Sequence, residues 1–482
     1  MFTENLLNNF GVYKTIDQPS KAYKRFSEVL RDIPDPVIDN VGLVEFIARG
    51  YFFSDRTLLK DATKTRWDHF HSKPHEVFLQ ARSRPSDFVD PKQIAMQLKE
   101  SLCAELLEFC NKKKRIILPL SGGMDSRVVA AVIRSLIDTK DLGVEVVAFT
   151  WGTSCSRDVR YASEIARLLK FEWMHVELSP EDLYKNIAIS AANGLEYSPL
   201  HLHGAHYLRS LKGYDGIVVS SYGDSIGRGR YSGRHISSLR MFSEIIDRYG
   251  LIEPRGIVAI RAELNKDLYV FRNSQDFRGG GCDEEINYQG HYMYRLINSV
   301  WAYVNEELEV FQAFTSKAVV EYMLNLSPAS RSDWPYFHIL DSLNKELLSV
   351  PWSATGGLYP NGRSRDKYKN FVAPYGSWTR SELYGEIVKL INTSSLIEHP
   401  LFSRGAIASL LAYLKRHEIE EANYKTELAL WFASFAVFLG NNKAVFNTDN
   451  LDFNRNRSLR HKFRVSTYEF ALRSKTKLNS LL

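Results

Sequence analysis

The stretch Ile116 to Val129, IILPLSGGMDSRVV, decides the fold that we predict for this chain. An apolar run leads into the loop SGGMDS at residues 121–126 and then directly into an amphipathic helix. In such a strand-to-helix turn the backbone N–H groups of the loop converge with the helix N-terminus, where the peptide dipoles favour negative charge. The two glycines carry no Cβ atom that would block a phosphate. The stretch therefore predicts an anion-binding loop after a buried strand.

The side chains of this loop indicate a nucleotide together with a metal ion. Ser121 and Ser126 can donate hydroxyl hydrogen bonds to phosphate oxygens. Asp125 would repel a bare phosphate, so its presence favours a bridging Mg²⁺, for which a carboxylate oxygen is a suitable ligand. The loop has neither the G-K-[ST] ending of a Walker A loop nor the G-x-G-x-x-G pattern of a dinucleotide loop. The residues predicted to bind ATP here are Leu120, Ser121, Gly122, Gly123, Asp125 and Ser126.

The segments on either side of the loop alternate between strand and helix patterns. The strand VEVVAFT, the helix VRYASEIARLLK, the strand WMHVEL and the strand GIVVS follow in turn, with a further helical segment before the last strand. This order with short links predicts an α/β fold with a parallel sheet of about five strands covered by helices. Beyond residue 230 the pattern is mainly helical with long loops. For residues 1 to about 90 the sequence predicts a small irregular or β-containing domain.

Composition limits the class of protein. The 482 residues, 44% hydrophobic and 24% charged, are enough for two or three domains, and the net charge of +6 is too mild to indicate nucleic acid. The four cysteines have no C-x-x-C spacing, which favours reduced thiols. The first residues are too polar for a signal peptide, and no run reaches the ~20 apolar residues of a membrane span. We expect a soluble, cytoplasmic protein.

The loop resembles the S-G-G-x-D-S pyrophosphate loop of the ATP pyrophosphatases, which implies an adenine nucleotide alpha hydrolase-like fold. On the loop alone asparagine, β-lactam, NAD, GMP and argininosuccinate synthetases and the tRNA-thiolating enzymes all stay open. Three later stretches resemble asparagine synthetases: AFTWGTSCSRDVRYASEIARLLKFEWMHVELSPEDL, IVVSSYGDSIGRGRY and ELEVFQAFTSKAVVEYMLNLSP. This resemblance runs from about residue 92 to 440. It implies ATP-dependent adenylation of a carboxylate, release of pyrophosphate, and amide formation with ammonia or an amine.

The resemblance also assigns roles to single residues. Phe149 and Thr150 would lie beside adenine, and Asp125 and Asp224 would hold magnesium on the phosphates, with Gly223 next to the nucleotide. Two carboxylates at the carboxyl ends of parallel strands face the same crevice. Tyr222 stands where asparagine synthetases usually carry a glutamate. It is either a base for the attacking amine, as in β-lactam synthetases, or a packing aromatic.

The family also supplies a lysine that stabilises the leaving pyrophosphate. In the stretch LLSVPWSATGGLYPNGRSRDKYK no lysine directly follows the tryptophan, and we choose Lys367 as the candidate. The alternatives are Arg363, Arg365 and Lys369. The missing lysine and the altered second signature, SSYGDSIGRG, leave open a degenerate ATP-binding homologue without turnover.

The amino-terminal region resembles the end of a glutaminase domain in the piece GYFFSDRTLLKDATKTR, but position 2 is Phe and the first cysteine is Cys103. Without a cysteine nucleophile this region cannot hydrolyse glutamine. We therefore predict a non-catalytic remnant at 1–90, a synthetase-like domain at 91–440 and a basic extension at 441–482. The acceptor would be a small-molecule or peptide carboxylate, and ammonia, an amine or a separate glutaminase would supply the nitrogen. Besides asparagine biosynthesis, a specialised amide ligase or cyclase of natural-product or surface-polysaccharide biosynthesis stays open.

Overall fold

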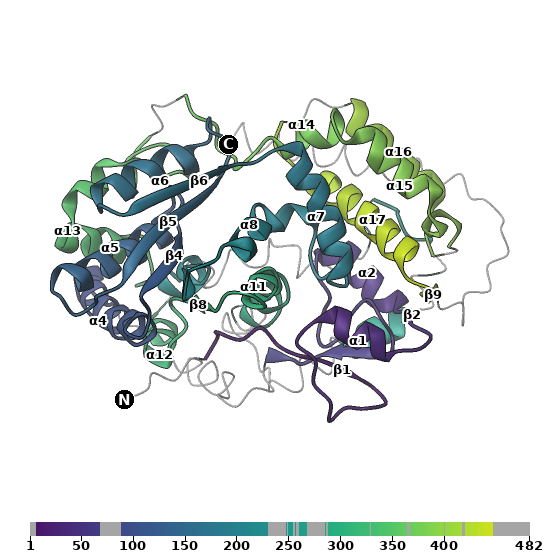
Figure 1. Cartoon of the computed structure of the whole chain (residues 1–482), viewed down its shortest axis with the longest axis horizontal. Coiled ribbons are helices and arrows are strands. Elements are labelled where there is room, and N and C mark those ends of the chain that lie inside the picture. The colour runs from purple at the N-terminus through teal and green to yellow at the C-terminus, as the bar shows by residue number, and fades with distance from the viewer. Residues whose placement is uncertain are drawn as a thin grey trace.

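The computed structural model describes residues 6–67, 88–229, 247, 249–253, 256, 260–267, 285, 288–327, 329–363, 367–399, 401–416 and 420–446. Its helices and strands form two groups that lie side by side (Figure 1). One group surrounds a parallel sheet, and the other is mainly helical. Each has its own cluster of buried hydrophobic side chains.

The sheet has five parallel strands in the order β6-β5-β4-β7-β8. Its strands are β4 (Arg115–Pro119), β5 (Glu145–Gly152), β6 (Glu172–Glu177), β7 (Gly216–Val219) and β8 (Val310–Gln312). In the central register Ile117 lies opposite Val147 on one side and Ile217 on the other. The central strands are apolar because helices cover both faces of a parallel sheet. The predicted α/β parallel sheet with flanking helices is confirmed.

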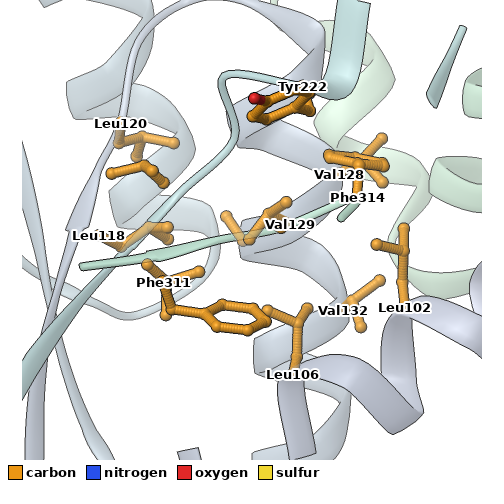
Figure 2. Close-up of a cluster of buried hydrophobic side chains, with 14 of the residues drawn as sticks. Leu102, Leu106, Leu118, Leu120, Val128, Val129, Val132, Tyr222, Phe311 and Phe314 are labelled. Atoms are coloured by element: carbon orange, nitrogen blue, oxygen red, sulfur yellow. The ribbon is translucent and has the colours of Figure 1, made fainter. Parts of the chain in front are cut away.

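The helices of this group are α4 (Pro91–Cys110), α5 (Met124–Asp138), α6 (Arg157–Leu168), α12 (Lys317–Asn325) and α13 (Trp334–Leu343). Figure 2 shows how α4 and α5 meet the sheet: Leu102 and Leu106 face Val132, and Val129 lies beside Leu118 and Phe311. This apolar layer fixes α5 directly behind the loop that precedes it. The close packing of this layer therefore holds the loop in a fixed position.

The second group contains α7 (Pro180–Ala192), α14 (Tyr375–Arg380), α15 (Tyr384–Thr393), α16 (Arg404–Arg416) and α17 (Tyr424–Asn441). The mainly helical part that the sequence predicts is thereby confirmed. The helix α17 is apolar on nearly all sides because its neighbours enclose it.

The amino-terminal segment packs against this second group. It contains β1 (Tyr13–Thr15), α1 (Phe26–Asp32), β2 (Val37–Ile38), α2 (Asn40–Arg49) and β3 (Ala62–Lys64). Phe46 of α2 stacks on Trp431 of α17 with ring centroids 4.3 Å apart, and β2 pairs in parallel with β9 (Val445–Phe446). These contacts join the predicted amino-terminal region to both later regions. The predicted boundary at residue 440 falls inside α17, and Phe446 beyond it packs on Phe435 of that helix. Most of the predicted basic extension lies outside the described residues.

The shorter elements are η3 (Pro199–Leu202), α8 (Ala205–Ser210), η4 (Gly223–Gly227), η7 (Tyr288–Ile297), α11 (Asn298–Asn305), η8 (Lys345–Ser349) and η9 (Ser395–Glu398). In Figure 1, α8 and α11 lie between the sheet and the second group of helices. None of the helices in the described ranges combines the length and apolar character that a membrane span requires.

Candidate nucleotide-binding site

The predicted anion-binding loop occupies residues 120–123, between the end of β4 and the start of α5. The Leu120 N–H donates to the Phe149 carbonyl at 2.8 Å, and the Thr150 hydroxyl donates to the Leu120 carbonyl at 2.8 Å. These bonds tie the loop to the end of the neighbouring strand β5. A Cβ atom at Gly122 would lie 2.9 Å from the Ser353 Cβ, so this position has room only for glycine.

Several N–H groups of the loop already have partners within the protein. The Gly122 N–H donates to Asp158 Oδ1 at 3.1 Å, and the Gly123 N–H donates to the Ser121 hydroxyl at 3.1 Å. The Ser121 N–H donates to the Ser126 hydroxyl at 3.2 Å. Burial raises the pKa of Asp158, while its hydrogen bonds lower it. The N-cap residue of the 15-residue helix α5 is Gly123, which has no side chain to cap the helix, so the donors of its first turn suit an anion.

Arg127 fixes the loop from beneath. Its side chain is fully buried, and its guanidinium donates to four carbonyl groups, those of Gly122, Leu347, Val350 and Pro351, over 2.7–3.0 Å. Burial lowers the pKa of Arg127 to about 9. Sequence reasoning missed this residue, although an arginine inside the apolar run of α5 is a signal that a buried partner exists.

The two predicted metal ligands come together as expected from the sheet topology. Asp125 lies in the first turn of α5, and Asp224 lies in η4, which directly follows β7. A Cβ atom at Gly223 would lie only 2.4 Å from the Asp125 Cβ, so the two loops touch at this glycine. The Tyr336 hydroxyl donates to the Gly223 carbonyl at 3.0 Å and holds the turn from α13.

A residue that the sequence did not single out, Arg228, lies between the carboxylates. Its Nε is 3.2 Å from Asp125 Oδ1, its Nη2 is 2.6 Å from Asp224 Oδ1, and its Nη1 is 3.1 Å from Asp333 Oδ1. The pKa of Asp125 is raised to about 6, because burial, the largest cause, and the charge of Asp224 together outweigh the lowering by Arg228. Burial alone would lower the pKa of Arg228, but Asp125 and Asp224 raise it above its usual range.

Phe149 and Thr150 lie in the carboxyl-terminal half of β5, next to the loop at residues 120–123. Both are buried, with 1% and 3% of their surface exposed. The Thr150 hydroxyl also accepts a hydrogen bond from Trp173 Nε1 at 3.1 Å. Their place beside adenine stays a prediction, and in this structure the Phe149 carbonyl and the Thr150 hydroxyl hold the loop.

Tyr222 belongs to the hydrophobic core. It is 1% exposed, and Figure 2 shows it in the cluster with Val128 and Phe314. Burial raises the pKa of its hydroxyl, which a hydrogen bond from Asn298 only partly offsets. These observations favour the packing aromatic over the base for an attacking amine.

The candidate lysine of the later loop is exposed. Lys367 lies on the surface, and its neighbour Lys369 forms an ion pair with Glu420 at 2.8 Å. Arg363 is also exposed, and Arg365 lies outside the described residues. From the same stretch, Trp352 lies with its ring centroid 5.5 Å from the Arg228 guanidinium. Arg228 therefore supplies positive charge next to Asp125 and Asp224, and the role of Lys367 stays a prediction.

Residues 111–193 match the family model described as asparagine synthase. This match confirms the predicted likeness for the segment that contains the loop, α5, β5, α6 and β6. No curated protein sequence matches the chain.

Solved structures give only partial superpositions. An NH3-dependent NAD synthetase from Campylobacter jejuni is 16% identical, with 42% of this chain and 97% of that chain covered and a TM-score of 0.23. An NMN synthetase from Francisella tularensis is 15% identical, with 51% and 97% covered and a TM-score of 0.21. The U34-tRNA thiolase NcsA from Methanococcus maripaludis is 10% identical, with 41% and 78% covered and a TM-score of 0.22.

Proposed function

We propose, from the premise that residues 111–193 are asparagine synthase-like, that this chain uses ATP to adenylate a carboxylate and then forms an amide with ammonia or an amine. The observation that carries the proposal is the convergence of the 120–123 loop and the turn after β7. Gly223 brings Asp125 and Asp224 to the uncapped N-terminus of α5. Donors for an anion and carboxylates for a cation lie together there, as a magnesium–polyphosphate ligand requires.

The charges of the cluster fit a divalent cation. Asp125, Asp224 and Asp333 with Arg228 leave two negative charges when all four groups are ionised. Within the described ranges no group of three or more His, Cys, Asp or Glu side chains is arranged to hold a metal by itself. Mg²⁺ bound with nucleotide phosphates needs only one or two protein carboxylates, so Asp125 and Asp224 suffice as candidates. Such an ion, when bound, neutralises charge on the phosphates.

The proposed reaction has two steps. A carboxylate oxygen of the acceptor attacks the α-phosphorus of ATP, the bond to the β-phosphate breaks, and pyrophosphate leaves. The nitrogen of ammonia or an amine then attacks the acyl carbon, the bond to AMP breaks, and the nitrogen loses a proton. The N–H groups of the first turn of α5 would bind phosphate oxygens, and Arg127 would keep their loop in place throughout.

A second candidate function is ATP binding without turnover. It is favoured by the burial of Tyr222 and by the ion pairs of Arg228 with both candidate metal ligands. Both candidates use the same nucleotide site, so they differ in chemistry rather than in binding.

The test is ATP–pyrophosphate exchange with magnesium and a panel of carboxylates that includes aspartate, sugar acids and short acidic peptides. We expect exchange with one class of carboxylate, and its loss in Asp125→Asn. The matched control is Asp138→Asn, at the other end of the same helix, where the exposed carboxylate pairs with Arg134. ATP binding without exchange for every acid would favour the second candidate, and no ATP binding at all would refute both.

A further inference from the structure

The two glycines next to Arg228 let the backbone pack closely against Tyr336 and Arg331. Glycine precedes and follows Arg228: a Cβ atom at Gly227 would lie 2.1 Å from the Tyr336 hydroxyl, and one at Gly229, where φ is +60°, would lie 2.1 Å from the Arg331 Cδ. Larger residues on either side would push the backbone away from Tyr336 and Arg331. The conformation that carries the Arg228 side chain into the cluster therefore depends on this G-R-G sequence.

The guanidinium forms ion pairs with carboxylates from three segments of the chain. Nε pairs with Asp125 at the start of α5, Nη2 with Asp224 after β7, and Nη1 with Asp333 at the start of α13. The rings of Tyr336 and Trp352 have centroids 5.7 Å and 5.5 Å from the guanidinium. A planar, permanently charged fork can make these contacts at once, which a lysine ammonium on its flexible stem cannot reproduce.

The exposed fractions of the four side chains show which of them a ligand from solvent would contact first. The Arg228 side chain is 5% exposed, whereas the side chains of Asp125, Asp224 and Asp333 are 22%, 27% and 35% exposed. The guanidinium therefore lies beneath the carboxylates and away from solvent. A ligand that enters from solvent reaches the carboxylates first, so Arg228 acts through them.

We propose that Arg228 is the positioning residue of this crevice: it holds the Asp125 and Asp224 carboxylates in one orientation and offsets part of their charge. The site then needs one divalent cation, rather than two, to accept the ATP polyphosphate. This inference rests on the proposed function. It places a fixed positive charge beneath the carboxylates, and Lys367 stays the candidate for the leaving pyrophosphate.

The test measures ATP binding by isothermal titration calorimetry at a series of MgCl₂ concentrations. In Arg228→Met we expect ATP affinity to fall about 10- to 100-fold at low magnesium, the range typical of residues that orient metal ligands. The loss should shrink at high magnesium, because a second ion from solution replaces the missing charge. Arg228→Lys keeps the charge but cannot hold three carboxylates, so we expect it to bind more weakly than wild type at low magnesium.

The matched control is Arg209→Met, which also removes an arginine paired with two carboxylates, those of Glu306 and Glu307, but on α8. If Arg228→Met binds ATP as tightly as this control at low magnesium, or loses affinity equally at every magnesium concentration, the inference is wrong. If Arg228→Met does not fold, Arg228→Lys is measured instead. ATP affinity equal to that of the Arg209→Met control at low magnesium would then show that the inference is wrong. Failure of wild type to bind ATP with magnesium would instead refute the proposed function.

Discussion

Gly223 and Asp125 lie so close that a Cβ atom at Gly223 would be 2.4 Å from the Asp125 Cβ. Real Cβ atoms do not approach that closely, so the turn after β7 and the first turn of α5 can meet only if residue 223 is glycine. This contact brings the two predicted metal ligands into one cluster.

Gly223→Ala should therefore separate the two loops. We expect ATP affinity in the presence of magnesium to fall by more than about tenfold, because Asp125 and Asp224 would no longer face one ligand. Calorimetric titration of ATP measures the effect. Gly385→Ala is the control, since a Cβ atom at Gly385 on α15 would meet no atom within 4 Å. Equal affinities of the two variants would show that the contact is not needed for binding.

Arg127→Met should lower stability and loosen the loop together. The substitution leaves the carbonyls of Gly122, Leu347, Val350 and Pro351 buried without this donor. We expect a loss of about 3 kcal/mol in the free energy of unfolding, measured by urea denaturation.

Arg134→Met on the same helix removes an ion pair with the exposed Asp138 and a contact with the Phe171 ring, and it should cost less than about 1 kcal/mol. A similar loss in both variants would contradict the role that we give to the four carbonyl bonds of Arg127.

A buried charge cluster links the amino-terminal segment to the rest of the chain. Lys64 Nζ lies 3.3 Å from Glu196 Oε2, and Arg295 Nη2 lies 3.3 Å from the same oxygen, with all three side chains at most 1% exposed. Glu196→Gln would leave two buried cations without a carboxylate, so we expect it to cost about 3–5 kcal/mol. Lys64→Met keeps the Glu196–Arg295 pair, and it should cost clearly less. Urea denaturation of both variants gives the comparison, and equal costs would be the contradicting result.

Glu45 should make stability depend on pH. It is 1% exposed and accepts a hydrogen bond from the Phe53 N–H at 3.2 Å, and burial raises its pKa to about 8. Between its ordinary pKa and pH 8 the unfolded chain has lost this proton while the folded chain retains it. The contribution of Glu45 to the free energy of unfolding is therefore full at low pH and falls by up to about 1.4 kcal/mol per pH unit as pH rises toward 8.

Glu45→Gln keeps a carbonyl oxygen for the Phe53 N–H and removes the titration. Urea denaturation from pH 5 to 8 should show a flatter dependence in this variant than in wild type. Glu386→Gln, at an exposed position of α15, is the control and should follow wild type. An unchanged slope in Glu45→Gln would mean that other groups govern the pH dependence.

The sequence by itself determined the parallel sheet and the strand–loop–helix turn around residues 121–126. Both are encoded by neighbouring residues: the apolar run, the two glycines and the amphipathic helix follow one another, and their periodicity can be read directly. The expectation that Asp125 and Asp224 share one crevice also followed, because parallel strands end at the same edge.

Only the tertiary structure decided what lies around these residues. Arg228 contacts carboxylates from segments more than 100 residues apart, and such pairing leaves no local pattern in the sequence. The burial of Tyr222 and the stacking of Phe46 on Trp431 likewise depend on how distant elements pack. Sequence periodicity reports which face of a helix or strand is buried, whereas the partner at that face is chosen by the packing of the whole chain.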